Sequence, residues 1–122
     1  MREGDENFDL RRRTKQFALR VIKLSSALPM DTESTVMRKQ MVRSGTSVGA
    51  QYREACRARS VAEFLSKMHQ GLQELDETTY WFELLVESNR VPEPKLADLM
   101  LEADELIAIF VSSIKTAGGH GS

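Results

Sequence analysis

At 122 residues the chain is long enough for one domain with a single core and too short for two. Hydrophobic residues make up 41% of it and charged residues 29%, a balance typical of a folded soluble protein. No apolar run approaches the roughly 18 residues that span a bilayer, and the polar N-terminus does not resemble a signal peptide. The single cysteine, Cys56, excludes an internal disulfide and is typical of a reducing compartment, so we expect a cytoplasmic protein.

The formal net charge of −1 hides a division between the two halves of the chain. Residues 1–59 hold 13 Lys and Arg against 7 Asp and Glu, a balance of +6, whereas residues 60–122 hold 4 against 11, a balance of −7. Such an asymmetry predicts one of two partners for the basic half: an anionic polymer, or the acidic half of another copy of the chain.

Apolar residues recur at helical spacing almost throughout the chain. The first predicted helix covers residues 11–28 and ends where Pro29 cannot donate the next backbone hydrogen bond. Its predicted inward face consists of Thr14, Phe17, Ala18, Val21, Ile22, Ser25 and Leu28. The second predicted helix covers residues 33–58, and either Asp31 or Thr32 is a suitable N-cap for it.

The third predicted helix covers residues 61–89 and has the clearest pattern. Ser60 and Glu63 form a capping box at its start, and its apolar positions alternate spacings of four and three, as in bundle helices. Those positions are Val61, Leu65, Met68, Leu72, Leu75, Thr79, Phe82 and Val86. The fourth predicted helix covers residues 94–117, between Pro94 in its first turn and the glycines that follow it. Its inward residues are Leu96, Leu99, Met100, Ala103, Leu106, Ile107, Phe110 and Ile114.

Short connections require each of these helices to run antiparallel to the next. The sequence therefore predicts an all-α fold, an antiparallel up-down four-helix bundle. We expect residues 1–122 to form this one domain, with frayed ends at residues 1–7 and 118–122.

Two glycines, Gly45 and Gly49, lie within the second predicted helix, where each costs about 1 kcal/mol relative to alanine. Because they are four residues apart, they share a helix face and leave a groove that another helix can approach closely. If the second and third helices turn near Ser60, Gly49 lies level with Gly71, and we expect the close approach there. A phosphate site lined by backbone is the less favoured alternative, since the glycines are not at a helix N-terminus.

Residues 77–85 carry large side chains in every direction, more than one core can cover. Tyr80, Trp81 and Leu84 fall wholly or partly outside the inward seam, which favours an oligomer contact; a thick core capped by the first helix is the alternative. The residues predicted to form an oligomer interface or a close helix packing are Gly45, Gly49, Tyr52, Gly71, Tyr80 and Trp81.

No catalytic or metal-binding pattern can be found in the sequence. A di-iron bundle needs two Glu-x-x-His pairs, but only His69 and His120 occur, and neither completes one. Cys56 lies near arginines but near no histidine in the sequence, so we expect a small buried thiol rather than a nucleophile. We predict no catalytic residues, no metal, no cofactor and no small-molecule substrate, and hence that the protein is not an enzyme.

Basic residues concentrate along the first two predicted helices. Besides the residues named at the end of this paragraph, they include Lys15 in the first helix and Arg59 directly after the second. Arginine suits phosphate because its planar group donates hydrogen bonds in a fork, and a basic stripe gains affinity for a polyanion by releasing counterions. No aromatic residues are interleaved to stack on bases, so binding would depend on shape and charge. The residues predicted to bind nucleic acid are Arg11, Arg12, Arg13, Arg38, Lys39, Arg43, Arg53 and Arg57.

Two stretches, residues 44–55 and 77–85, resemble a bacterial family of four-helix bundles named for proteins encoded in intervening sequences of 23S rRNA genes. The accessory variability proteins of diversity-generating retroelements are similar, and the resemblance covers about residues 8–117. It implies an up-down bundle assembled as a homopentameric ring, with nucleic-acid association in some members. The family often has Asn-Tyr-Glu-Glu where this chain has Gln51-Tyr52-Arg53-Glu54, which makes the second helix more basic here. The signature positions, for which the resemblance implies structural roles, are Gly45, Gly49, Tyr52, Thr78, Tyr80 and Trp81.

The residues and the resemblance together predict a ring-forming protein that binds structured RNA or an RNA–protein complex through its first two helices. Expected partners are further copies of the chain, with a pentamer favoured, and RNA or DNA; no membrane partner is expected. The alternative is a protein-interaction scaffold whose charges serve assembly. The two hypotheses differ in what a charge reversal breaks first, the affinity for nucleic acid or the oligomer.

Overall fold

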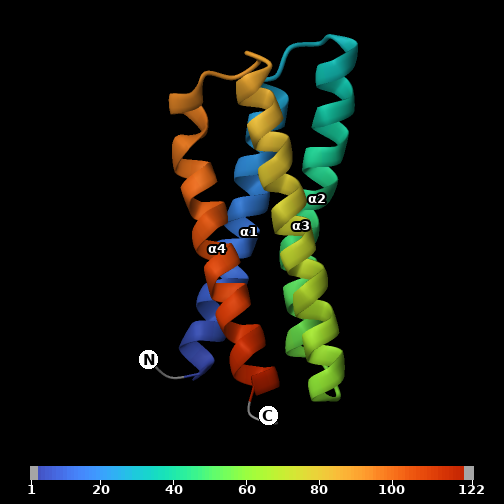
Figure 1. The fold of residues 1–122 in the computed structure, drawn as a ribbon, viewed down its shortest axis with the longest axis vertical. Helices are drawn as coiled ribbons and strands as arrows, with labels where there is room; N and C mark the ends of the chain where they lie inside the picture. Colours follow the sequence, from blue (N-terminus) through green and yellow to red (C-terminus); the bar gives the residue numbers. More distant parts are fainter. Residues whose placement is uncertain (1–2, 120–122) are drawn as a thin grey trace.

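The computed structural model describes the backbone of residues 3–119 and the side chains of residues 9–119. Within this part of the chain, four α-helices follow one another: α1 (Glu3–Ser26), α2 (Thr32–Cys56), α3 (Val61–Glu87) and α4 (Glu93–Gly119). Each helix runs antiparallel to the next, and the connections alternate between the two ends of the bundle (Figure 1). The fold is therefore the predicted all-α, up-down bundle.

The helix ends agree with the prediction to within two residues, except at the start of α1. That helix begins at Glu3 rather than near residue 11, so the expected frayed segment 1–7 is helical from Glu3 onward. No proline interrupts residues 3–10, and the buried Leu10 continues the inward face of the helix. At the other end, α4 continues through Gly118 to Gly119 instead of stopping before them, and residues 120–122 lie outside the described part of the chain.

Side-chain caps fix the starts of α2 and α3. Asp31 is the N-cap of α2 and accepts a hydrogen bond from the Ser34 amide. Ser60 is the N-cap of α3 and accepts one from the Glu63 amide at 3.0 Å. In a capping box the Glu63 side chain would accept a hydrogen bond from the amide of the N-cap residue, Ser60. Here the Glu63 carboxylate accepts from the Arg59 amide instead.

The buried side of α3 is displaced from the predicted seam. Its buried residues are Met68, Gly71, Leu75, Thr78, Phe82 and Leu85, still at alternating spacings of three and four. Leu72, Thr79 and Val86, which were predicted for one row of the seam, are only half-buried. The apolar pattern overlooks Gly71 and Thr78 because neither is a large hydrophobic residue. Two further residues that were predicted to point inward, Ile22 on α1 and Val61 at the start of α3, are instead 45% and 60% exposed.

Buried glycines let helices approach closely, but two of them face a different helix from the one that the sequence predicts. A Cβ atom added to Gly45 would lie 2.9 Å from the Val21 side chain of α1, and one on Gly49 would lie 3.1 Å from a hydroxyl of the same helix. A Cβ on Gly71 would lie 2.6 Å from the Phe110 ring of α4. Gly45 and Gly49 therefore face α1 rather than α3. The expected close approach of α2 and α3 is nevertheless present, since these two helices share more close backbone contacts than any other pair, and a Cβ on Gly71 would also lie 3.6 Å from the Cβ of Gln51 on α2.

A buried hydrogen bond also links α2 to α3. The Ser44 and Thr78 hydroxyls lie 2.7 Å apart, and both side chains are fully buried. Either hydroxyl can donate in this pair, because each also has a carbonyl acceptor in its own helix, Met41 at 3.3 Å for Ser44 and Glu74 at 2.7 Å for Thr78. Both polar groups are thus satisfied in the core, which avoids the cost of burying an unpaired hydroxyl.

The N-cap of α2 is tied to the connection between α3 and α4. Arg90 donates to the Asp31 carboxylate at 2.7 Å and to the Ser34 hydroxyl at 2.9 Å. The hydrogen bond from Arg90 is the main cause that lowers the pKa of Asp31 below its ordinary value, and bonds with Ser34 lower it further. The folded protein therefore favours the ionised form of Asp31.

Replacing Arg90 by glutamine is expected to make the stability of the protein less sensitive to low pH. Because the folded state lowers the pKa of Asp31, the ion pair contributes to stability above the ordinary pKa of about 4 and loses that contribution as the pH falls. The Tm of Arg90→Gln should therefore fall less than that of wild type between about pH 5 and pH 2. Thermal unfolding followed by circular dichroism measures both slopes.

Lys95→Gln provides the control for this comparison. Lys95 is exposed at the start of α4 and has no ion pair among the described residues, so its loss should leave the wild-type slope unchanged. If Arg90→Gln also kept the wild-type slope, the Arg90–Asp31 pair would not contribute to acid sensitivity.

Candidate nucleic-acid interface

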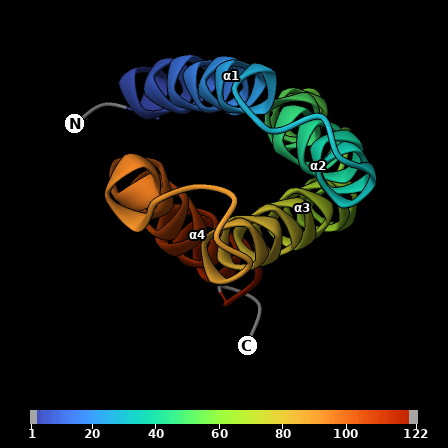
Figure 2. The same ribbon diagram turned by 90° about the horizontal axis from the view of Figure 1, so that it is seen from above.

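The outer face of α1 carries positively charged side chains, and over most of its length the helix contains no Asp or Glu that could pair with them. Between residues 10 and 30 the sequence contains no Asp or Glu. In the bundle α1 contacts α2 on one side and α4 on the other, and it shares fewer contacts with α4 (Figure 2). The cations of this segment are Arg11, Arg12, Arg13, Lys15, Arg20 and Lys23.

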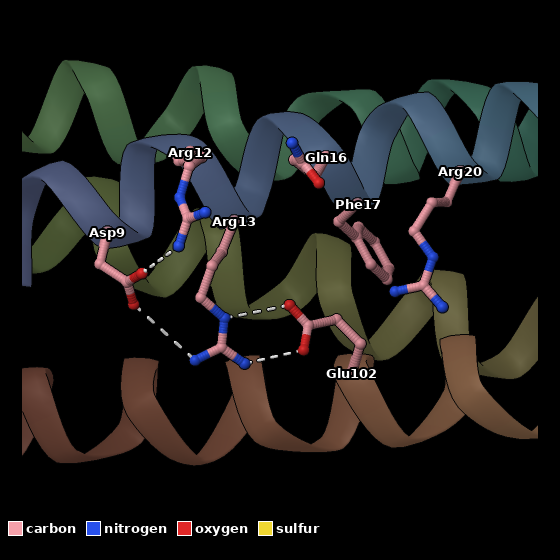
Figure 3. A pocket seen from close by; sticks show the side chains of 7 residues that line it. All are labelled: Asp9, Arg12, Arg13, Gln16, Phe17, Arg20 and Glu102. Carbon is pink, nitrogen blue, oxygen red and sulfur yellow. Dashed lines mark hydrogen bonds and ion pairs between the residues drawn. The ribbon is translucent and has the colours of Figure 1, made fainter.

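Arg13, one of the residues predicted to bind nucleic acid, instead links α1 to α4. Its guanidinium donates to both oxygens of the Glu102 carboxylate, at 3.1 and 2.7 Å, and to Glu105 at 3.1 Å (Figure 3). Asp9 lies 3.9 Å from Arg13 and accepts a hydrogen bond from Arg12 at 3.0 Å. Hydrogen bonding to Glu102 is the main cause that raises the pKa of Arg13 above its ordinary value. The protein's own carboxylates thus neutralise Arg13 and share the charge of Arg12.

Arg38 caps the C-terminal end of α1. Its guanidinium donates to three backbone carbonyls at or just after the last turn, those of Ser25, Leu28 and Pro29, at 3.0, 3.3 and 2.9 Å. The Ser25 carbonyl also accepts from the Leu28 amide at 3.3 Å, whereas Arg38 is the partner that the described residues supply to the Leu28 and Pro29 carbonyls, so its role is to fasten the end of α1 to α2.

Arg43 joins α2 to α3. It binds the Glu74 carboxylate at 3.2 Å and also donates to Glu77. The bond to Glu77 is the main cause that raises the pKa of Arg43. Half of the eight predicted residues, namely Arg12, Arg13, Arg38 and Arg43, are therefore engaged by groups of the protein itself.

The remaining predicted residues, Arg11, Lys39, Arg53 and Arg57, have no ion pair within residues 9–119. Lys15, Arg20 and Lys23 have the same property, although the predicted set did not include them. The absence of acids between residues 10 and 30 was the signal that would have identified them.

The unpaired cations of α1 and α2 come together at one end of these helices. A Cβ on Gly49 would contact Thr14, so these two residues are level on the neighbouring antiparallel helices. Arg11 lies about one turn before Thr14, and Arg53 lies one turn after Gly49, which places the two arginines at the same height. Lys15 and Arg57 extend the group, while Lys39 lies about 21 Å further along α2 at 1.5 Å per residue. We call Arg11, Lys15, Arg53 and Arg57 the α1–α2 basic surface.

The residues predicted for an oligomer interface or close packing divide into two groups. Gly45, Gly49, Tyr52 and Gly71 are buried within the bundle, so they pack helices of one protomer. Tyr80 is 53% exposed, and its ring lies 5.5 Å from that of the half-buried Trp81. The indole of Trp81 donates to Glu77 at 3.3 Å. Of this set, Tyr80 presents the most apolar area to solvent.

The side chains that could act in catalysis or bind a metal are dispersed over the bundle. Cys56 is exposed, not buried as the sequence predicted, and His69 is exposed on α3. Across residues 9–119 no three His, Cys, Asp or Glu side chains are grouped as a metal site requires, and His120 lies outside this range. No helix in the described part of the chain is both long and apolar enough to cross a membrane.

The sequence pattern of the 23S rRNA-intervening sequence proteins matches residues 6–112. The chain belongs to the 23S rRNA-intervening sequence protein family. The crystal structure of a protein with unknown function from the S23 ribosomal protein family of Bacteroides thetaiotaomicron is similar to it, with 34% sequence identity and a TM-score of 0.83. The match covers 89% of this chain and 97% of that one. No curated protein is significantly similar to the chain. Membership of the 23S rRNA-intervening sequence protein family accounts for the fold, and the function has to be argued from the residues themselves.

Proposed function

We propose that this member of the 23S rRNA-intervening sequence protein family binds structured RNA, alone or within an RNA–protein complex, and catalyses no reaction. The observation that carries the proposal is the α1–α2 basic surface, whose cations have no ion pair among the described residues. Like charges held together repel one another, and an anionic partner removes that repulsion. Elsewhere on α2 the fold supplies such partners itself, as Glu74 and Glu77 do for Arg43.

The chemistry of this surface favours recognition of the phosphate backbone. Arginine donates in a planar fork that matches phosphate oxygens, and three of the four residues are arginines. No aromatic side chain belongs to the surface, so bases have no platform on which to stack. Contacts of this kind position a nucleic acid by its shape without reading its sequence, which is how folded RNA is commonly bound.

Self-association is part of the same proposal. Leu19, Ile22 and Tyr80 are 55%, 45% and 53% exposed, and another copy of the chain would cover such apolar area. A ring, pentameric in the proteins that the sequence resembles, would repeat the basic surface once per protomer. Several weak phosphate contacts would then act together and raise the overall affinity.

The proposal is tested by fluorescence anisotropy of the nucleic-acid-free protein with a labelled RNA hairpin and a DNA duplex of the same length. With about four phosphates contacted, the logarithm of the binding constant should fall with the logarithm of salt with a slope of about −3 to −4. We expect a Kd in the micromolar range or tighter at about 0.15 M salt. Absence of binding to both at that salt would refute the proposal and favour a protein-interaction scaffold.

A further inference from the structure

A polar hollow of about 380 Å³ lies between α1 and α4. Its volume is within the range of sites that take small molecules or single chemical groups. Six of the seven lining residues belong to α1, and the hollow lies where α1 meets the helix with which it shares fewer contacts. The lining residues are Asp9, Arg12, Arg13, Gln16, Phe17, Arg20 and Glu102 (Figure 3).

Three arginines and two carboxylates line the hollow, and Glu105 next to it also accepts from Arg13 at 3.1 Å, so Arg20 is the lining cation that no carboxylate of the described residues pairs with. Both oxygens of Glu102 are engaged by Arg13, at 2.7 and 3.1 Å, and Asp9 is engaged by Arg12 at 3.0 Å. The carboxylates are thus directed at arginines that they hold in place. This arrangement reduces their repulsion toward an anion that enters the hollow.

Arg20 is the lining arginine that the fold does not engage. It has no ion pair among the described residues, and Figure 3 shows it extending from α1 toward α4 beside Phe17. Its guanidinium donors therefore remain available, and the amide of the exposed Gln16 lies one helical turn before it on the same side of α1. Phe17, which lies between them in the sequence, is fully buried and supports the hollow from beneath.

We propose that this hollow binds a terminal phosphate group, with Arg20 as the main recognition residue and Gln16 as a second donor. A terminal phosphomonoester can enter a concave site end-on, whereas an internal phosphodiester carries a sugar on each side. It also carries about −1.5 to −2 charge at pH 7, which the unpaired charge of Arg20 attracts more strongly than the single charge of a diester. Arginine matches its oxygens with two parallel N–H donors.

The inference deepens the proposed function, on which it rests for the polymer. The hollow lies on the α4 side of α1 and the α1–α2 basic surface on the other side, so a strand that crosses α1 can reach both. The terminal phosphate has two possible sources, the 5′ end of a bound RNA and a free mononucleotide. Both share the chemistry of a phosphomonoester, and separate arms of the experiment distinguish them.

The test compares one labelled RNA hairpin with a single-stranded 5′ extension, carrying either a 5′-phosphate or a 5′-hydroxyl. We expect the phosphate to tighten Kd by about fivefold to tenfold, as one charge-assisted pair at a partly exposed site would. Arg20→Gln should abolish this ratio and leave the affinity for the 5′-hydroxyl RNA within about twofold, since Arg20 has no structural partner to lose. Unchanged circular dichroism and Tm verify that the variant folds.

Lys23→Gln is the matched control, because Lys23 is an exposed, unpaired cation of α1 that does not line the hollow. It should leave the affinity for both RNAs within about twofold and keep the ratio between them. Equal affinity of wild type for the two RNAs would overturn the inference and leave the proposed function intact. Titration of adenosine monophosphate, followed by calorimetry, tests the hollow without the polymer. If the monophosphate binds to wild type and not to Arg20→Gln, the phosphate site is supported and a free nucleotide is a source of its phosphate. If neither RNA binds and the monophosphate does not bind either, the proposed function and the inference both fail.

Discussion

Phe82→Ala is expected to lower the free energy of unfolding by about 3–5 kcal/mol. Phe82 is fully buried on α3, and its ring meets that of Phe17 on α1 edge to face, with centroids 6.3 Å apart. Removing the ring leaves a cavity in the centre of the bundle and deletes a contact between helices that are not adjacent in the chain. Urea unfolding followed by circular dichroism measures the change.

Tyr80→Ala is the matched control, two residues away on the same helix. Tyr80 is 53% exposed, so its loss should cost less than about 1 kcal/mol in the free energy of unfolding. Its effect should appear instead in self-association, measured by light scattering after gel filtration. Equal destabilisation by the two substitutions would mean that α3 does not present Phe82 to the core in the way the structure shows.

Gly71→Ala is expected to destabilise the protein even though alanine is the better helix former. A Cβ at this position would lie 2.6 Å from the Phe110 ring, and that ring is fully buried, so it cannot move aside without displacing its neighbours. Overpacking of this kind costs about 1–3 kcal/mol, and the gain in helix propensity offsets about 1 kcal/mol of it. The net loss should be up to about 2 kcal/mol in urea unfolding.

Gly118→Ala makes the same chemical change where there is space. Its added Cβ would lie 3.6 Å from Leu65, an ordinary contact distance, so the helix propensity of alanine should stabilise the end of α4 slightly. The opposite signs expected for the two glycines separate steric crowding from propensity. A stabilising Gly71→Ala would show that α3 and α4 do not approach as closely as described.

Much of this fold follows from patterns that the sequence displays locally. Prolines and caps fix helix ends, which is why Asp31 and Ser60 could be identified before the structure. The partners of the glycines could not be, because spacing shows that Gly45 and Gly49 share a face but not which helix that face meets. The resemblance implied a structural role for Thr78, but its hydrogen bond could not be predicted for a related reason, since its partner Ser44 lies on another helix.

The candidate site was predictable as a region and not as a set of residues. The excess of cations in residues 1–59 indicates α1 and α2 as the region of the candidate site. Which of those cations are neutralised depends on tertiary contacts, such as the pair of Arg13 with Glu102, 89 residues away in the sequence. Arg43 is similarly neutralised by acids of α3. Reversing the charge of either residue would damage the bundle itself, so the unpaired cations are the ones to substitute.

The most direct test of nucleic-acid binding by the α1–α2 basic surface compares two double variants that remove equal charge. Arg53→Gln with Arg57→Gln removes half of the surface, whereas Lys95→Gln with Lys115→Gln removes two exposed, unpaired cations of α4. For the RNA hairpin at about 0.15 M salt, the first pair should weaken binding about tenfold or more and reduce the salt slope by about 2. The second pair should leave the affinity within about twofold of wild type. Equal weakening by both pairs, or no weakening by the first, would contradict a binding surface on α1 and α2.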